Sequence, residues 1–204
     1  MTTSELQVIV LCAGGHAKVV IDVLALMKIK VLGIVDTDPA LTGKNVLGVS
    51  VLGGENILDR YEPARIKLAN GLGGAQSMAS RRELFERFLI KGFRFIEIVH
   101  PSAVIAQDVV LSEGVQVMAG AVVQTGVSIG EDTIINTRAS VDHDCRIGGH
   151  VHVAPGVTIC GGVEIEDEAY IGSGSTVTPG VRIGKGVLVR AGSLITRDLN
   201  IGRS

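Results

Sequence analysis

Aromatic residues are scarce in this sequence, and their distribution divides the chain. The 204 residues include no tryptophan, two tyrosines and four phenylalanines, and every phenylalanine lies before residue 100. After that point Tyr170 is the only aromatic residue, while glycine, valine and isoleucine dominate. Because aromatic rings supply much of the buried area in ordinary cores, the second half must fill its interior with small aliphatic side chains. We therefore expect two domains, residues 1–99 and residues 100–204.

Charge of one sign, paired cysteines and long apolar runs are also missing. The net charge of -2 argues against nucleic acid and anionic membranes as partners. No basic segment precedes an apolar run at the start, and no uncharged run reaches the roughly 18 residues that span a bilayer. The three cysteines are odd in number and form no CxxC pair, which fits a reducing compartment. These absences predict a soluble cytoplasmic protein.

The second half carries an internal repeat of six residues. From Ile105 to Ile201, each sixth residue is isoleucine, leucine or valine, without a slip. The residue two positions earlier is uncharged and mostly small, as Ala103, Ala121 and Cys145 illustrate. A period of six fits neither a helix nor simple strand alternation. It predicts a β-solenoid in which three hexapeptides close one triangular coil and both positions point inward. The alternative is a β-sandwich with chance periodicity.

The first half reads as alternating strands and helices. This order predicts a Rossmann-like βαβ domain with a parallel sheet. About 100 residues leave room for one mononucleotide-binding unit, so NAD is not expected. The fold class is therefore an α/β domain followed by an all-β solenoid. The expected elements are strands at Gln7–Leu11, Lys30–Val35, Ile66–Ala69 and Arg94–Val99, a helix from the glycine turn to about Met27, and a helix at Ala79–Ile90.

A glycine turn follows the first strand, in the segment LCAGGHAK. Gly14 and Gly15 would open the helix so that backbone N–H groups face a phosphate. Asp36, at the end of the second strand, is placed to accept a hydrogen bond from a ribose hydroxyl. Cys12 and Ala17 stand where a GxGxxG fingerprint has its first and third glycines. A nucleotide site and a plain strand-to-helix turn both fit this segment.

Three of the five histidines lie within ten positions, in HDCRIGGHVH. On the repeat, His143 and His150 fall at corners and His152 falls outward on a strand, so none is a core residue. Solvated surface histidines, a zinc site and a general base are the possible interpretations. Cys145 falls in the inward register, which argues against it as a zinc ligand or a nucleophile, because burial raises the pKa of a thiol. His143 has an aspartate on either side, and such a pair can act as a general base near neutral pH.

Several segments together resemble the sialic acid O-acetyltransferase-like family of hexapeptide-repeat nucleotide-sugar N-acetyltransferases. They are AGGHAK, HPSAVIA, the unbroken hexapeptides, and INTRASVDHDC with HVHVAPG. The family includes UDP-N-acetylbacillosamine and GDP-perosamine N-acetyltransferases. The resemblance implies a left-handed coil, acetyl-CoA as co-substrate, no metal, and a homotrimer with active sites between subunits. It also implies N-acetylation of a nucleotide-linked 4-amino-dideoxy sugar, with a UDP-linked sugar favoured. GDP-perosamine-type N-acetylation and sialic-acid-type O-acetylation are the alternatives.

The resemblance also implies a role for each matching residue. His143 is the catalytic base, Asp144 supports it, and Asn136 lies beside the sugar. His150 matches no family role and is expected at the surface. Two further sets are implied, the nucleotide-binding residues Gly14, Gly15, His16, Asp36 and Gly71 and the acetyl-CoA-binding residues His152, Gly161, Ser173 and Ala191.

Two features depart from the family's pattern. Cys12 replaces the first glycine of the turn, and the sequence lacks the GxPAK-like C-terminal segment that closes the coil stack near the adenine end of CoA. The second departure leaves open a function of another class, a non-catalytic scaffold that binds a nucleotide sugar. Turnover of the acetyl-CoA thioester separates an enzyme from such a scaffold.

Overall fold

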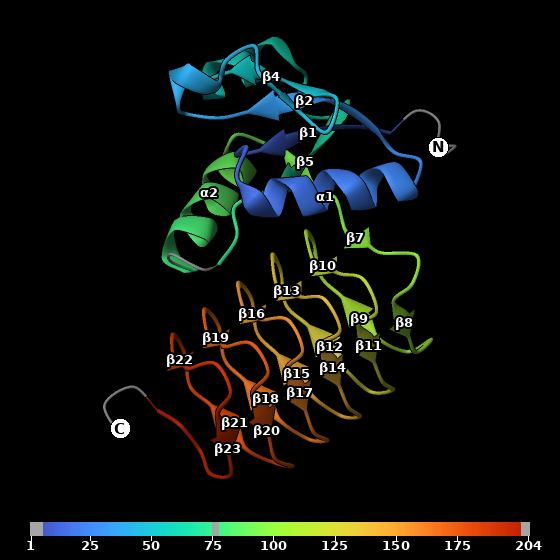
Figure 1. The fold of residues 1–204 in the computed structure, drawn as a ribbon, viewed down its shortest axis with the longest axis vertical. Helices are drawn as coiled ribbons and strands as arrows, with labels where there is room; N and C mark the ends of the chain where they lie inside the picture. The colour runs from blue at the N-terminus through green and yellow to red at the C-terminus, as the bar shows by residue number, and fades with distance from the viewer. Residues whose placement is uncertain (1–5, 75–77, 201–204) are drawn as a thin grey trace.

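A computed structural model describes residues 6–74 and 78–200 of the chain. In Figure 1, the strands β1 to β6 form a sheet flanked by two helices, and the strands from β7 onward form a coil that stacks away from it. The fold class predicted from the sequence is confirmed, with an α/β domain followed by a left-handed β-helix of hexapeptides.

The N-terminal sheet has the strand order β3-β4-β2-β1-β5-β6 and is parallel except for the β3–β4 hairpin. The first two predicted strands are confirmed at both ends, while the hairpin and two short 3-10 helices were not predicted. The elements are β1 (Gln7–Leu11), α1 (Gly15–Leu26), β2 (Lys30–Val35), η1 (Pro39–Leu41), β3 (Asn45–Val46), β4 (Val49–Gly53), η2 (Glu55–Arg60), β5 (Ile66–Asn70), α2 (Met78–Ile90) and β6 (Arg94–Phe95).

β1 is buried on both faces, which explains its continuous apolar run. Val8 and Val10 pack in the cluster that includes α1, whereas Ile9 and Leu11 pack in the cluster that includes α2. Successive strand side chains point to opposite faces, so one helix covers each face, as a parallel sheet requires. Because β1, β2 and β5 are parallel, their carboxyl ends lie at one edge of the sheet, next to the start of α1.

The coil has three faces, each a ladder of two-residue parallel strands (Figure 1). A strand pairs with the strand 18 residues later on the same face, as Val123 pairs with Val141. The β10 face holds β7 (Ile98–Val99), β10 (Gln116–Val117), β13 (Ile134–Ile135), β16 (His152–Val153), β19 (Tyr170–Ile171) and β22 (Leu188–Val189). The β11 face holds β8 (Val104–Ile105), β11 (Val122–Val123), β14 (Ser140–Val141), β17 (Thr158–Ile159), β20 (Thr176–Val177) and β23 (Leu194–Ile195). The β12 face holds β9 (Val110–Leu111), β12 (Ser128–Ile129), β15 (Arg146–Ile147), β18 (Glu164–Ile165) and β21 (Arg182–Ile183).

Residues of the six-residue repeat fill the interior of the coil. Every repeat aliphatic from Val117 to Val189 is buried, and Cys145 is 0 % exposed in the same core, while the expected inward Ile201 lies outside the described residues. The single strand expected at Arg94–Val99 is wrong. It divides because β6 pairs with β5 in the first sheet and β7 pairs with β10 in the coil. The coil ladder therefore begins two residues before the expected domain boundary.

From Gly114 to Gly192, each corner of the coil turns through a residue with positive φ. Glycine usually holds this position, as at Gly126 and Gly162, because it has no Cβ to clash. Other residues there cost on the order of 1–3 kcal/mol each, so surrounding contacts must hold them. Five corners have a non-glycine residue at this position, with φ from 55° to 62°: Asp132, Arg138, Asp144, His150 and Glu168.

The N-terminal domain packs onto the coil at the β10 face and at the neighbouring corner with the β12 face. Ile98 and Met118 of the coil are buried in the same apolar cluster as α1. Arg82 of α2 forms an ion pair of 2.7 Å with Glu168 at that corner. The junction therefore covers part of the coil that the hexapeptide pattern alone would leave in water.

Candidate active site

His143 lies at the corner between the β11 and β12 faces, with its side chain 58 % exposed. Its Nδ1 lies 2.8 Å from Oδ2 of Asp144, while Asp142 accepts a hydrogen bond from the backbone N–H of His143. Because a carboxylate accepts hydrogen bonds, Nδ1 carries the proton and Nε2 keeps a free lone pair. The pair therefore has the geometry of a general base and its orienting acid.

Two carboxylates raise the pKa of His143 above its ordinary value. The hydrogen bond with Asp144 is the largest cause, and the negative charge of Asp142 adds to it. Asp144 itself has a φ of 59°, at a corner position where the next coil has Gly162. Strained backbone at such a position is typical of functional sites, and here it places the carboxylate beside the ring.

Gly161 lies directly against the imidazole in the next coil. A Cβ at this position would lie 2.6 Å from Nε2 and 2.7 Å from Cε1 of His143. A glycine is therefore needed for the ring to lie as it does. The resemblance assigns Gly161 to acetyl-CoA, and the structure adds that it is in contact with the predicted base.

The β11 face carries a groove of about 200 Å³ beside this corner. Its lining includes Ser140, Asp142, Thr158 and Cys160. At the opposite edge of the same face, Ser173 and Ala191 are exposed in successive coils. The residues expected to bind acetyl-CoA thus flank the β11 face on both sides, apart from His152.

The glycine turn after β1 begins α1, with Gly14 as the N-cap residue. Gly14 and Gly15 are exposed, and a Cβ on either would meet nothing within 4 Å. Backbone N–H groups at a helix start with no side-chain cap can donate hydrogen bonds to a bound anion. Cys12 has a φ of 69°, so it adopts the conformation that glycine adopts more readily.

Asp36 and Gly71 fix the surroundings of this turn. Asp36 accepts hydrogen bonds from the backbone N–H groups of Ala13 at 2.7 Å and Asp38 at 2.8 Å. It therefore ties β2 to the turn, while its oxygens retain lone pairs for the predicted ribose contact. A Cβ on Gly71 would lie 2.5 Å from the carbonyl oxygen of Leu11, so no other residue fits there.

His16 and Asn136, expected at the nucleotide and the sugar, both contact the β10 face. Nε2 of the half-buried His16 lies 2.7 Å from Oε1 of Gln116. Burial lowers the pKa of His16 to about 4, and the nearby positive charge of Arg81 adds to this effect. Nδ2 of Asn136 lies 3.0 Å from Nε2 of His152.

His152 points outward from the coil as expected, yet it is only 6 % exposed. Gly74 lies against its ring, so closely that a Cβ there would collide with Nδ1. Burial lowers the pKa of His152 to about 3, and the charges of His16 and Arg81 add to this effect. Nδ1 has no hydrogen-bond partner within the described part of the chain. The interpretation as a solvated surface histidine is therefore wrong for His152, because the N-terminal domain covers this strand.

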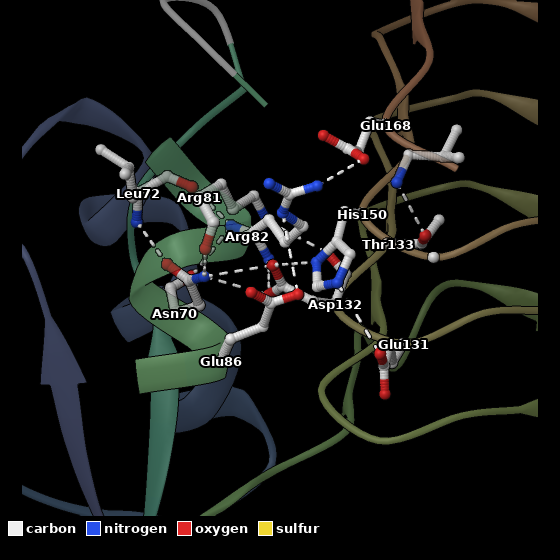
Figure 2. A network of polar contacts seen from close by, with 12 residues as sticks. Asn70, Leu72, Arg81, Arg82, Glu86, Glu131, Asp132, Thr133, His150 and Glu168 are labelled. Carbon is white, nitrogen blue, oxygen red and sulfur yellow. Dashed lines mark hydrogen bonds and ion pairs between the residues drawn. The ribbon is translucent and has the colours of Figure 1, made fainter. Parts of the chain in front are cut away.

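The expectation of a surface position for His150 is also wrong. His150 is 5 % exposed, since the start of α2 packs on its corner. Its Nδ1 lies 3.2 Å from Oδ2 of Asp132, and its ring meets the edge of Phe85 with centroids 5.5 Å apart. Figure 2 shows His150 between Asp132 and Glu131, facing α2.

The network in Figure 2 joins the two domains and was missed by the sequence analysis. Arg81 and Asp132 form an ion pair of 2.7 Å in which both side chains are 0 % exposed. Nδ2 of Asn70 donates to Asp132 at 3.0 Å, and Arg81 also donates to the carbonyl of Leu72. The available signal in the sequence was Asp132 itself, an acidic residue at a corner position where other coils have Gly114 and Gly186. A non-glycine residue in this conformation indicates that a tertiary contact holds it.

The predicted residues form separate groups within one chain. Corner residues His143, Asp144 and Gly161 lie between the β11 and β12 faces. The nucleotide turn and His152 lie at the β10 face, which is the side of the triangular coil opposite that corner. One chain therefore does not bring the predicted base to the predicted nucleotide site.

Residues 6–74 and 78–200 offer neither a cluster of metal ligands nor a membrane-spanning helix. In this part of the chain, no three or more histidine, cysteine, aspartate or glutamate side chains are arranged to hold a metal ion. No helix there is long and apolar enough to cross a membrane. Cys145 faces the core, where burial raises its pKa.

Comparison with known sequence families gives two matches. Residues 7–88 match the PglD N-terminal domain. Residues 144–179 and 162–197 match the bacterial transferase hexapeptide of six repeats. GDP-perosamine N-acetyltransferase of Escherichia coli O157:H7 is 32% identical over 137 residues, which are 67% of this chain and 60% of that protein.

Solved structures cover nearly the whole chain. The acetyltransferase domain of PglB from Neisseria gonorrhoeae FA1090, also solved in complex with acetyl coenzyme A, is 32% identical, with a TM-score of 0.88 over 96% of this chain and 93% of that one. PerB from Caulobacter crescentus, in complex with CoA and GDP-perosamine, is 40% identical, with a TM-score of 0.87 over 95% of this chain and 90% of that one.

Proposed function

The chain belongs to the family of hexapeptide-repeat acetyltransferases with a PglD N-terminal domain, and from this premise we propose that it transfers an acetyl group from acetyl-CoA to the amine of a nucleotide-linked 4-amino sugar. The observation that carries the proposal is the His143–Asp144 pair, which leaves a free imidazole nitrogen at an exposed corner. Relatives solved with CoA and GDP-perosamine support the substrate class.

In the proposed reaction, Nε2 of His143 takes a proton from the sugar amine as its nitrogen attacks the thioester carbonyl carbon. A C–N bond forms, and collapse of the tetrahedral intermediate breaks the C–S bond. The CoA thiolate leaves and takes the proton from Nε2. Asp144 keeps the ring in the Nδ1–H tautomer and stabilises the imidazolium. The steps are complete without an acyl-enzyme intermediate.

Acetyl-CoA would lie along the β11 face in this proposal. The groove beside His143 is lined by hydroxyl groups from Ser140 and Thr158. Gly161 has no side chain, so it leaves space next to the imidazole of His143. Ser173 and Ala191, at the far edge of the face, are assigned to the same co-substrate. His152 lies beneath the N-terminal domain of its own chain, so its predicted contact with acetyl-CoA requires Nδ1 to become accessible.

We further propose a homotrimer in which the site is completed between chains. The reason is geometric, because a base at one corner and a nucleotide turn over the opposite face cannot act together within one chain. Two large apolar side chains on the β11 face support a subunit contact, since Val104 is 63% exposed and Leu194 is 67% exposed. A neighbouring chain would then supply the nucleotide turn.

GDP-perosamine is the first substrate to test. The sequence favours a UDP-linked sugar by resemblance, whereas the PerB structure was solved with GDP-perosamine at 40% identity. Release of free thiol from acetyl-CoA should be measured with GDP-, UDP- and dTDP-linked 4-amino sugars. No thiol release with any of them would favour the non-catalytic scaffold.

Replacement of the proposed base tests the mechanism. His143→Ala should lower kcat by roughly 10²–10⁴, the usual contribution of a general base. His100→Ala is the matched control. Within the described residues, the only hydrogen-bond partner of the His100 side chain is Ser102. Near-normal turnover in a well-folded His143→Ala protein would contradict the proposed mechanism.

A further inference from the structure

Gln116 links the coil to the glycine turn through both ends of its side-chain amide. Gln116 is the outward residue of β10 and is 1 % exposed. Its Nε2 lies 2.7 Å from the carbonyl oxygen of Asn70 at the end of β5. Its Oε1 lies 2.7 Å from Nε2 of His16. No role is assigned to this residue by the resemblance.

The amide orientation of Gln116 follows from these contacts. A backbone carbonyl only accepts hydrogen bonds, so the amide group at 2.7 Å from Asn70 must be the NH₂ group. The other end is then the oxygen, which only accepts. The nitrogen of His16 that faces it must therefore carry a proton, and neutral His16 is the Nε2–H tautomer.

The second nitrogen of His16 is consequently an acceptor. In residues 6–74 and 78–200, Nδ1 makes no hydrogen bond, and His16 itself lies in the first turn of α1, two residues after the N-cap Gly14. A neutral imidazole in this tautomer cannot donate from Nδ1 to a phosphate. It can accept from a hydroxyl or an amine, and burial keeps it neutral, since the pKa of His16 is lowered to about 4.

We propose that Gln116 is a positioning residue that holds His16 with an unprotonated Nδ1, so that His16 accepts a hydrogen bond from a hydroxyl or amino group of the nucleotide sugar. The inference rests on the proposed function for its substrate. Under this proposal the glycine turn has two separate roles. The backbone N–H groups at the start of α1 bind the phosphate, and His16 recognises a hydrogen-bond donor group of the sugar next to that phosphate.

The tautomer can be measured without any ligand. Long-range proton–nitrogen NMR spectra of histidine-labelled protein at neutral pH distinguish the two neutral forms, and His16→Gln assigns the signal. We expect the Nε2–H form in the wild type. Gln116→Met, which keeps the length of the side chain and removes both hydrogen bonds, should give a mixture of tautomers. An Nδ1–H form in the wild type, or an unchanged spectrum in Gln116→Met, would overturn the inference.

The role in binding is tested with GDP-perosamine and acetyl-CoA. Gln116→Met should raise KM for GDP-perosamine about 3- to 10-fold, the usual range for one lost hydrogen bond, and leave kcat and KM for acetyl-CoA unchanged. Arg82→Met is the matched control, because it removes the ion pair with Glu168 at the same domain junction and does not touch the turn. Equal effects of both variants would mean that Gln116 only holds the domains together, and would overturn the inference.

Failure of the proposed function gives a different result. A wild type that neither binds nor turns over GDP-perosamine and its UDP- and dTDP-linked counterparts contradicts the substrate. The NMR measurement still decides whether Gln116 fixes the tautomer.

Discussion

The domain junction should weaken steeply between pH 7 and pH 5, because it holds the buried His152 and the half-buried His16 in their neutral forms. The pKa of His152 is lowered from 6.5 to about 3, and that of His16 from 6.5 to about 4. Both folded values lie below the unfolded value, so the unfolded chain binds more protons as the pH falls. The contribution of these two histidines to the free energy of unfolding is fully present above pH 6.5. It decreases as the pH falls below 6.5, until the pH reaches the pKa values of the folded state.

The magnitude follows from the distance between the assay pH and the unfolded pKa. At pH 5 each histidine is 1.5 units below 6.5, which corresponds to about 2 kcal/mol at 1.36 kcal/mol per unit. The two together should cost about 4 kcal/mol. This is a large part of the 5–15 kcal/mol by which typical proteins are stable.

Urea unfolding at pH 7 and pH 5, at one fixed protein concentration, measures this loss. His152→Gln and His16→Gln cannot titrate, so each should reduce the difference between the two pH values by about 2 kcal/mol. The wild-type carboxylates titrate equally in all three proteins and cancel in the comparison. A pH difference that neither variant changes would refute the reasoning from burial.

Four further variants test the corner of the proposed base and the coil core beside it. Asp144→Asn should lower the pKa of His143 and so shift the acid limb of the pH profile of kcat/KM to lower pH. It should also lower the plateau of that profile, because the tautomer of His143 is no longer fixed. An unchanged pH profile would contradict the role of Asp144. Gly161→Ala should lower kcat about 10²-fold by displacing the ring, with little change in Tm. Gly162→Ala, at a φ of 68° with open space around it, should instead lower stability by about 1–2 kcal/mol and spare kcat, and the opposite order would contradict the assignment. Cys145→Ala should cost about 1 kcal/mol in urea unfolding and retain activity, whereas loss of activity at unchanged stability would contradict its inward register.

Local pattern was sufficient for the coil and the main strands of the first sheet. The register of the hexapeptides placed Cys145 inside and His143 at a corner, because each repeat residue meets only its neighbours 18 residues away. The β3–β4 hairpin was missed, since its turn-rich segment carries no clear period. The positions of these elements therefore reflect how much of their environment is local in sequence.

The environment of the site depended on contacts distant in sequence. His150 and His152 point outward from the coil, so the repeat alone implied solvent around them. They are buried because α2 and the Gly74 segment cover that side, and no hexapeptide position records a neighbouring domain. For the same reason the hexapeptide pattern did not reveal the contact of Gln116 with His16 or the ion pair of Asp132 with Arg81, because both partners lie in the N-terminal domain.

The buried Arg81–Asp132 pair restricts how the two domains can be recombined. A different sheet domain joined to this coil would have to bring a cation to the position of Arg81, since an uncompensated buried charge typically costs about 3–5 kcal/mol. It would also need a ring nitrogen or similar donor opposite Gln116. The β11 face makes no such demand, because its outward residues are remote from the junction. If the proposed function holds, acyl-donor preference can change by single substitutions on the β11 face, whereas exchange of the N-terminal domain requires matched changes on both sides of the domain junction.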